Sequence, residues 1–120
     1  MKLIGIILAA ALLCGTAQAA DKDGNFHVLG SGMLTCQAYL DANDKDRLSA
    51  ELWWEGYVTA MNRLTDDTWS VVGKDDPVDR VNAAIQKQCK EHSKILFTIA
   101  VHNAIQSLRD DHRVKVAPKD

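Results

Sequence analysis

Two widely separated cysteines constrain this fold more than any other feature of the sequence. Cys36 and Cys89 lie outside the first 19 residues, and Cys14 is the third cysteine of the chain. In an oxidising compartment an even pair predicts a disulfide, and two cysteines allow a single intramolecular connectivity. Closing so long a loop stabilises a domain by about 4 kcal/mol, against roughly 5–15 kcal/mol for the whole domain. Two free thiols or a metal site are the alternatives.

The first 19 residues predict export to such a compartment. Lys2 precedes an uncharged apolar run over residues 3–13, and Ala17-Gln18-Ala19 supplies the small residues that a signal peptidase reads before Ala20. The run is shorter than the about 20 residues of a transmembrane helix. We therefore expect a cleaved signal peptide over residues 1–19, a periplasmic mature protein without stable membrane insertion, and removal of Cys14 with the signal. A retained anchor and lipidation at Cys14 are the alternatives.

The mature chain is predicted to form one small all-α domain. About a hundred residues remain after cleavage, which is enough for one modest core. Residues 20–32 carry charges and three glycines without periodicity, as expected for a flexible arm. The helical domain is expected over residues 33–110, and the charged tail over 111–120 is expected to fray.

Capping residues and apolar spacing predict four helices. Thr35 is the expected N-cap of a short helix that runs through about residue 42, and a second helix follows over about 47–64. Asp76-Pro77 predicts the start of a third helix, with Asp as N-cap and Pro at the first helical position. Ser93 is the expected cap of a fourth helix that runs to about residue 110.

Apolar residues at intervals of three and four give each helix a buried face. In the second helix this stripe is Leu48, Leu52, Tyr57, Met61 and Leu64, widened by Trp53, Trp54 and Val58. In the third it is Val78, Val81, Ile85 and Cys89, and in the fourth Phe97, Val101, Ala104, Ile105 and Leu108. Adjacent Trp53 and Trp54 point about 100° apart, so one belongs at the edge of the face. Gly56 is expected to allow close approach of another helix.

The sequence predicts no enzyme, no cofactor and no metal. No serine lies in a nucleophile elbow, and Gly30-Ser31-Gly32 is too short for a phosphate-binding loop. Cys89 and His92 have the spacing of half a zinc site, but no second pair completes it. The formal net charge of −2 excludes a cationic nucleic-acid binder.

Acid is expected to change the charge of this chain greatly. The chain has 14 Lys and Arg, 16 Asp and Glu, and four His, and Lys2 leaves with the signal. Below about pH 3 most carboxylates are protonated, so the mature chain approaches about +18. Such self-repulsion loosens a compact state, while a disulfide limits the expansion. His92 and His102 are the candidate pH-responsive residues, because histidine titrates near pH 6.5; a half-buried surface residue is the alternative for His102.

Several motifs resemble the periplasmic acid-stress chaperones HdeA and HdeB. They are Leu34-Thr35-Cys36-Gln37-Ala38-Tyr39-Leu40-Asp41, then Trp53-Trp54, then Ile85-Gln86-Lys87-Gln88-Cys89-Lys90 followed by Phe97. The resemblance covers about residues 33–108. It implies a helical homodimer near neutral pH that loosens in strong acid, exposes apolar surface and keeps unfolding periplasmic proteins from aggregating.

The same resemblance assigns roles to particular residues. Cys36 and Cys89 match the family disulfide, and Trp53 and Trp54 match an apolar patch on the second helix. With Tyr57, these tryptophans are the candidate surface for a client or partner. The stretch over residues 56–60, followed by Asn62, is similar instead to small exported proteins that include type VI secretion immunity proteins. A periplasmic protein-binding module of that kind is therefore the alternative function.

Overall fold

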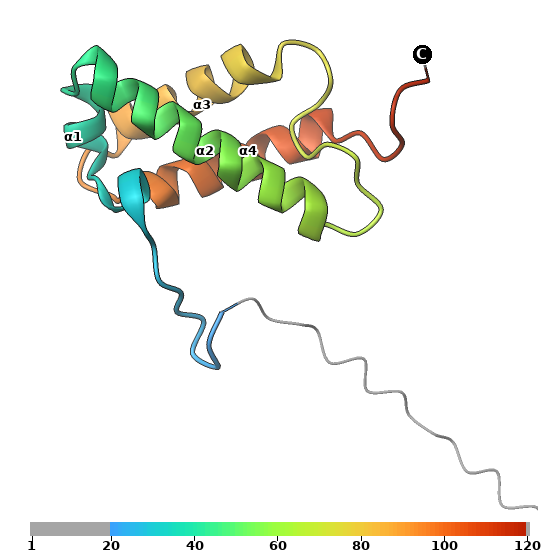
Figure 1. The fold of residues 1–120 in the computed structure, drawn as a ribbon, viewed down its shortest axis with the longest axis horizontal. Helices are drawn as coiled ribbons and strands as arrows, with labels where there is room; N and C mark the ends of the chain where they lie inside the picture. Colours follow the sequence, from blue (N-terminus) through green and yellow to red (C-terminus); the bar gives the residue numbers. More distant parts are fainter. Residues whose placement is uncertain (1–19, 120) are drawn as a thin grey trace, which may run out of the picture.

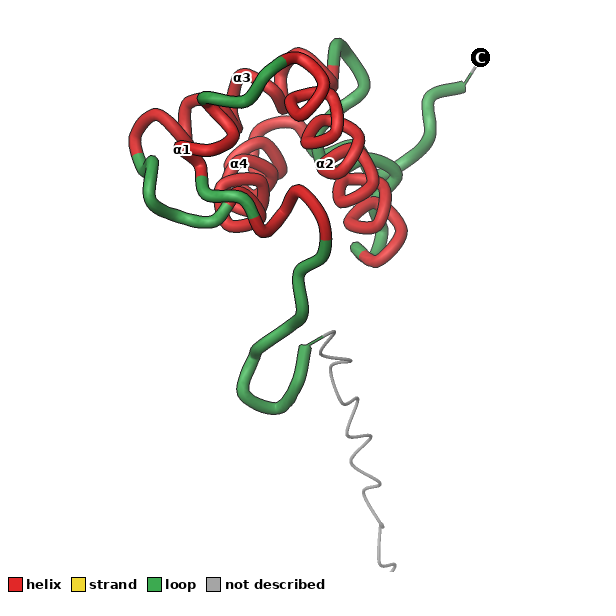
Figure 2. The backbone as a smooth tube through the Cα atoms, turned by 60° about the vertical axis from the view of Figure 1, so that its left-hand side comes forward, coloured by secondary structure: helices red, strands yellow, loops and turns green. Residues whose placement is uncertain are grey.

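The computed structural model describes residues 20–119, so the predicted signal peptide lies outside the described residues. The described chain forms a 3-10 helix and four α-helices: η1 (Gly30–Met33), α1 (Cys36–Leu40), α2 (Asp44–Leu64), α3 (Pro77–Glu91) and α4 (Phe97–His112). The helices α2 and α3 both lie alongside α4, and α1 lies against α3 at one end (Figures 1 and 2). Strand pairing within residues 20–119 is limited to two isolated bridges. The all-α prediction is confirmed.

The core lies where α1, α3 and α4 meet, and one face of α2 closes it. Its largest fully buried side chains are Phe97, Ile85, Ile105, Val71, Val81 and Val101, together with Cys36 and Cys89. The predicted stripes of α3 and α4 account for most of them. Val78 is the exception in α3, because 41% of its surface is exposed.

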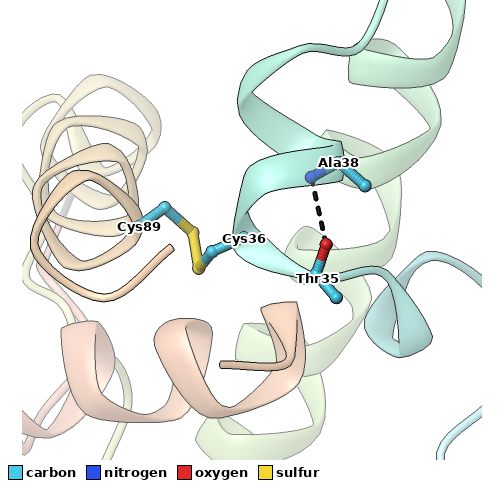
Figure 3. Close-up of a disulfide and its surroundings, with 4 residues drawn as sticks. All are labelled: Thr35, Cys36, Ala38 and Cys89. Atoms are coloured by element: carbon cyan, nitrogen blue, oxygen red, sulfur yellow. Dashed lines mark hydrogen bonds between the residues drawn. A yellow bond between two sulfur atoms is a disulfide. The ribbon is translucent and has the colours of Figure 1, made fainter. Parts of the chain in front are cut away.

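The disulfide joins the start of α1 to the last turns of α3 (Figure 3). The Cα atoms of Cys36 and Cys89 are 4.8 Å apart, and both residues are fully buried. Thr35 caps α1 as predicted, since its hydroxyl accepts from the Ala38 backbone N–H at 3.1 Å. The helix ends at Leu40 rather than at residue 42. The predicted disulfide is therefore confirmed, and its oxidised Cys89 offers no thiolate for the alternative zinc site.

Two expectations for α2 are wrong. The helix begins at Asp44 rather than near residue 47, because Asn43 caps it by accepting from the Asp46 N–H at 3.0 Å. Its buried face is Ala50, Trp54 and Val58, whereas the predicted stripe members Leu48, Leu52 and Leu64 are 55%, 61% and 69% exposed. Trp54 and Val58, which were expected to widen the stripe, are buried as predicted, and Ala50 was missed because alanine is a weak apolar signal.

The start of α3 is confirmed, but the role of Asp76 is not. Pro77 occupies the first helical position as predicted. Asp76 stands at the N-cap with a left-handed backbone (φ 45°), and its side chain makes no capping hydrogen bond.

The predicted start of α4 at Ser93 is wrong. The helix begins at Phe97 and has Leu96 at its N-cap position. Residues 93–96 pair instead with the segment around Thr35: the N–H of Cys36 donates to the Ile95 carbonyl at 2.8 Å, and that of Gln37 to the Ser93 carbonyl at 2.8 Å. The Ser93 and Ile95 carbonyls thus accept from α1, whereas in a helix that began at Ser93 they would accept the first intrahelical hydrogen bonds.

The loop before α3 is held by the end of the chain. Its Val71 and Val72 are buried in the core, and Ser70 pairs with Val114 through backbone bonds of 2.9 and 3.0 Å. Arg113 donates to Thr68 Oγ1 at 2.7 Å. The tail that was expected to fray from residue 111 is thus helical to His112 and attached at residues 113–115.

Candidate functional site

Four aromatic side chains meet between α1, α2 and α4, and we call them the aromatic cluster: Tyr39, Trp53, Tyr57 and Phe97. The ring centroids of Trp53 and Tyr57 are 5.6 Å apart in a stacked arrangement. Phe97 connects Trp53 to Tyr39, with ring centroids 6.0 Å from Trp53 and 4.5 Å from Tyr39. Separating α2 from α4 would part Trp53 and Tyr57 from Phe97.

The N-terminal segment covers Trp53. We call residues 28–32 the strap. The indole N–H of Trp53 donates to the Leu29 carbonyl at 2.7 Å. Gly32 is buried against the indole, and a Cβ at this position would lie 2.2 Å from Trp53 Cζ2. Residues 30–33 are therefore ordered as η1 against α2, although the arm was expected to be flexible as far as residue 32.

Trp54 faces α3 rather than the strap. It is 2% exposed, and its indole N–H donates to Asn82 Oδ1 of α3 at 3.1 Å. Trp53 remains half-buried, so one tryptophan is central and the other lies at the edge, as expected. The three predicted surface residues Trp53, Trp54 and Tyr57 thus form no common exposed patch in the folded state.

Tyr57 connects the aromatic cluster to α4. Its hydroxyl lies 3.0 Å from His102 Nδ1, and the two rings meet edge to face. Burial raises the pKa of the Tyr57 phenol. Burial also raises the pKa of Tyr39, and the positive charge of the Arg47 guanidinium above the Tyr39 ring partly opposes this rise. The sequence expectation of a half-buried His102 is wrong, because its side chain is exposed. His92 is also exposed and follows the last residue of α3, so the two histidines occupy different elements.

An apolar groove extends the site along the C-terminal half of α2. It has a volume of about 610 Å³ and includes Phe26, Tyr57, Met61 and Leu64 in its lining. A smaller cavity of about 220 Å³ continues from Phe26 and Tyr57 to Thr98, Ile99 and His102 on α4. The N-terminal arm therefore contributes Phe26 to both cavities.

Carboxylates take little part in holding the helices together. Every described Asp and Glu is exposed or half-buried, and the buried polar residues are Ser70 and Thr98. Within residues 20–119 one ion pair forms, between Lys115 and Asp67 at 3.1 Å on the surface. Protonation therefore meets no buried carboxylate in the described chain.

A comparison with protein families matches residues 3–97 of this chain to the HdeA/HdeB family. The chain belongs to the HdeA/HdeB family. No curated protein and no solved structure matches it. The HdeA/HdeB assignment agrees with the helical fold and the Cys36–Cys89 disulfide. It also supports the class of periplasmic acid-stress chaperones, which are not enzymes.

None of the helices over residues 20–119 combines the length and the apolar character that crossing a membrane requires. No group of three or more His, Cys, Asp or Glu in the same part of the chain is placed to hold a metal ion.

Sequence reasoning missed the strap and its glycines. Gly30-Ser31-Gly32 was considered only as a phosphate loop, whereas Gly30 adopts a left-handed φ of 65° and Gly32 allows contact with Trp53. Two glycines separated by one residue were the available signal, although the sequence does not show what they contact. Gly56 was expected to allow close helix approach, but a Cβ there would meet nothing within 4 Å.

Proposed function

We propose that this protein is an exported acid-stress chaperone that loosens at low pH and binds unfolding periplasmic proteins. The observation that carries the proposal is the aromatic cluster between α2 and α4, in a chain of the HdeA/HdeB family. Aromatic side chains bury large apolar areas and dominate binding energetics. A separated α2 would present such a surface to the apolar segments of a client.

The trigger is the net charge of the whole molecule rather than one buried group. All described carboxylates are accessible to protons in the folded state, so acid removes their charge before the fold opens. The remaining cations approach about +18 in the mature chain, and their mutual repulsion favours expansion. Acid also neutralises Asp44 and Asp46 in the first turn of α2, which removes their favourable interaction with the helix dipole.

The helix α2 is the element that is most easily separated. Its uncharged side-chain bonds to other parts of the chain are Trp53 to Leu29, Trp54 to Asn82, Tyr57 to His102, and Asn62 to the Val71 N–H. Two bonds involve charged groups, the Arg47 guanidinium to the Leu40 carbonyl of α1 at 2.8 Å and the Asn82 amide of α3 to Glu51 at 3.4 Å. The Cys36–Cys89 disulfide meanwhile keeps α1 on α3. Expansion is therefore expected to expose the aromatic cluster without complete unfolding.

A client-aggregation assay tests this function. Light scattering of an acid-sensitive client is measured near pH 2.5 and at pH 7, with and without the protein. We expect suppression at the acid pH only, reduced in Trp53→Ala. Trp69→Ala is the matched control, because Trp69 lies outside the cluster and is already 43% exposed. Unchanged scattering with the wild-type protein at pH 2.5 refutes the function, and equal loss in both variants refutes the assigned surface.

A protein-binding module of the immunity type remains the alternative. Two of the residues that suggested it have structural roles here: Val58 is buried in the core, and Asn62 accepts the Val71 N–H at 2.8 Å. We therefore favour the chaperone.

Near neutral pH we also expect a homodimer, and exposed Leu48 and Leu52 on the outer face of α2 offer it an apolar surface. Sedimentation at pH 7 measures the oligomeric state.

A further inference from the structure

The strap is attached weakly compared with the chain that follows it. Its side-chain hydrogen bond to the rest of the molecule is the one from Trp53 to Leu29. Backbone hydrogen bonds to the rest of the molecule begin only after the strap. The Phe97 N–H donates to the Leu34 carbonyl at 2.7 Å, and the Cys36 N–H donates to the Ile95 carbonyl at 2.8 Å. The strap can therefore detach as far as residue 33 without disturbing the anchored segment.

The fit of the strap on Trp53 depends on its glycines. Gly30 has φ 65°, a left-handed conformation that favours glycine. At Gly32 a methyl group would lie 2.2 Å from the indole and 2.7 Å from Val28 Cγ1. Leu29 and Met33 meanwhile stay 66% and 59% exposed. The strap is thus a mostly apolar segment that meets Trp53 through the Leu29 carbonyl and the glycine backbone.

We propose that the strap is a displaceable internal cover of the aromatic cluster, and that an apolar, weakly charged segment of a client protein takes its place. Releasing the strap breaks one side-chain hydrogen bond and exposes the Trp53 ring, which stacks on Tyr57. Separating α2, by contrast, also exposes the buried Ala50, Trp54 and Val58. The cover therefore opens in a local fluctuation of lower free energy than helix separation. The inference deepens the proposed function and rests on it for the nature of the occupant.

A pair of glycine substitutions tests the cover at pH 7, where the fold is compact. Gly32→Ala forces the strap from the indole, and overpacking of this kind raises the open population roughly tenfold or more. Gly56→Ala is the matched control, because its methyl group enters open space. Hydrogen exchange should show lost protection over residues 28–34 in Gly32→Ala only, and hydrophobic-dye fluorescence should rise in parallel.

Three outcomes of this comparison overturn the proposal. Lost protection with dye binding equal to that of Gly56→Ala shows that the strap covers no binding surface. Unchanged protection over residues 28–34 shows that the Gly32 contact does not hold the strap. Lost protection that extends through α3 and α4 shows that the strap is a structural part of the core rather than a cover.

A second variant and a peptide keep the test independent of one substitution. Trp53→Phe keeps an aromatic ring but removes the donor to Leu29, so it should raise dye binding less than Gly32→Ala does. A synthetic peptide of residues 26–34 should reverse the dye binding of Gly32→Ala, whereas the same peptide with alanine for Gly32 should not. Equal effects of the two peptides, or no effect of either, contradict the cover.

This experiment separates the failure of the cover from the failure of the chaperone function. The dye, exchange and peptide measurements are made at neutral pH without a client. A protein that suppresses client aggregation at pH 2.5 but shows none of the Gly32→Ala effects has the function without the cover. One that shows these effects but no suppression has a displaceable strap and a different occupant.

Discussion

The indole N–H of Trp54 donates to Asn82 Oδ1 at 3.1 Å and ties the middle of α2 to α3. Trp54 is 2% exposed, so its N–H has little access to water as a substitute partner. A donor left without a partner in such a place is costly, and a well-made bond there specifies how two helices meet. Asn82 also approaches Glu51 Oε1 at 3.4 Å, which orients its amide.

The first prediction concerns this contact. Asn82→Ala leaves the Trp54 N–H without its partner and should lower the free energy of unfolding by about 1–3 kcal/mol at pH 7. Urea denaturation followed by circular dichroism measures it. Asn103→Ala is the control, because Asn103 is exposed within α4 and gains the same helix propensity. Equal stability of the two variants would show that the bond contributes nothing.

The second prediction concerns the disulfide. The bond closes a loop with a sequence separation of 53, so its reduction should lower the free energy of unfolding by about 4 kcal/mol. Denaturation with and without a phosphine reductant measures the change, and Cys36→Ala/Cys89→Ala should not respond to the reductant. A fall below about 1 kcal/mol would mean that the reduced chain is already restrained by other contacts.

The third prediction separates two basic residues that hold the loop before α3. The Arg113 guanidinium donates to Thr68 Oγ1 at 2.7 Å and to the Asp66 and Asp67 carbonyls at 2.8 and 3.0 Å. Lysine cannot reproduce this fork, so Arg113→Lys should destabilise the fold by about 1–3 kcal/mol. The acceptors are uncharged, so the loss should be similar at pH 7 and pH 4.

Lys115 provides the contrast for Arg113. It pairs with the Asp67 carboxylate, and both side chains are more than 60% exposed. Lys115→Ala should therefore lower stability by at most about 1 kcal/mol at pH 7, and by nothing once acid protonates its partner. A strong pH dependence for Arg113→Lys, or a large effect of Lys115→Ala, would contradict this division.

The fourth prediction concerns alkaline pH. Burial raises the pKa of Tyr39 above its ordinary value of 10.0, because ionisation inside the fold is unfavourable. The stability that comes from keeping the Tyr39 phenol neutral is complete below the pKa of tyrosine in the unfolded chain. It is lost as the pH rises through the higher pKa of the folded state. Tyr39→Phe should therefore weaken the fall in stability between about pH 9 and pH 11.5, measured by denaturation at each pH and compared with pH 7. An unchanged slope would contradict the prediction.

Local chemistry in the sequence was a good guide where neighbouring residues decide the structure. Thr35 caps α1, Pro77 begins α3, and the spacing of Val81, Ile85 and Cys89 places the second cysteine on a buried face. These features depend on residues within a turn or two of one another. The disulfide also followed from the number of cysteines and the predicted export.

Long-range packing decided the features that the sequence did not reveal. Ser93 is a suitable cap in isolation, but its carbonyl accepts the Gln37 N–H instead. Leu48 and Leu52 have helical spacing as good as that of Ala50 and Trp54, so spacing alone cannot choose between the two faces of α2. The cover over Trp53 depends on contact between segments 21 residues apart, and no local pattern predicts which tryptophan Gly32 meets.

The Cys36–Cys89 bond gives the chain the topology of a lariat. Residues 36–89 form a closed ring that contains α1, α2 and most of α3, while α4 and the strap lie on the two open ends. However far the expanded molecule opens, α1, α2 and α3 cannot drift apart beyond the circumference of that ring. The aromatic side chains of α2 thus stay on a tethered ring, and Phe97 leaves or returns with a free end. Refolding after neutralisation then repacks α2 and the two ends onto a ring that is already closed.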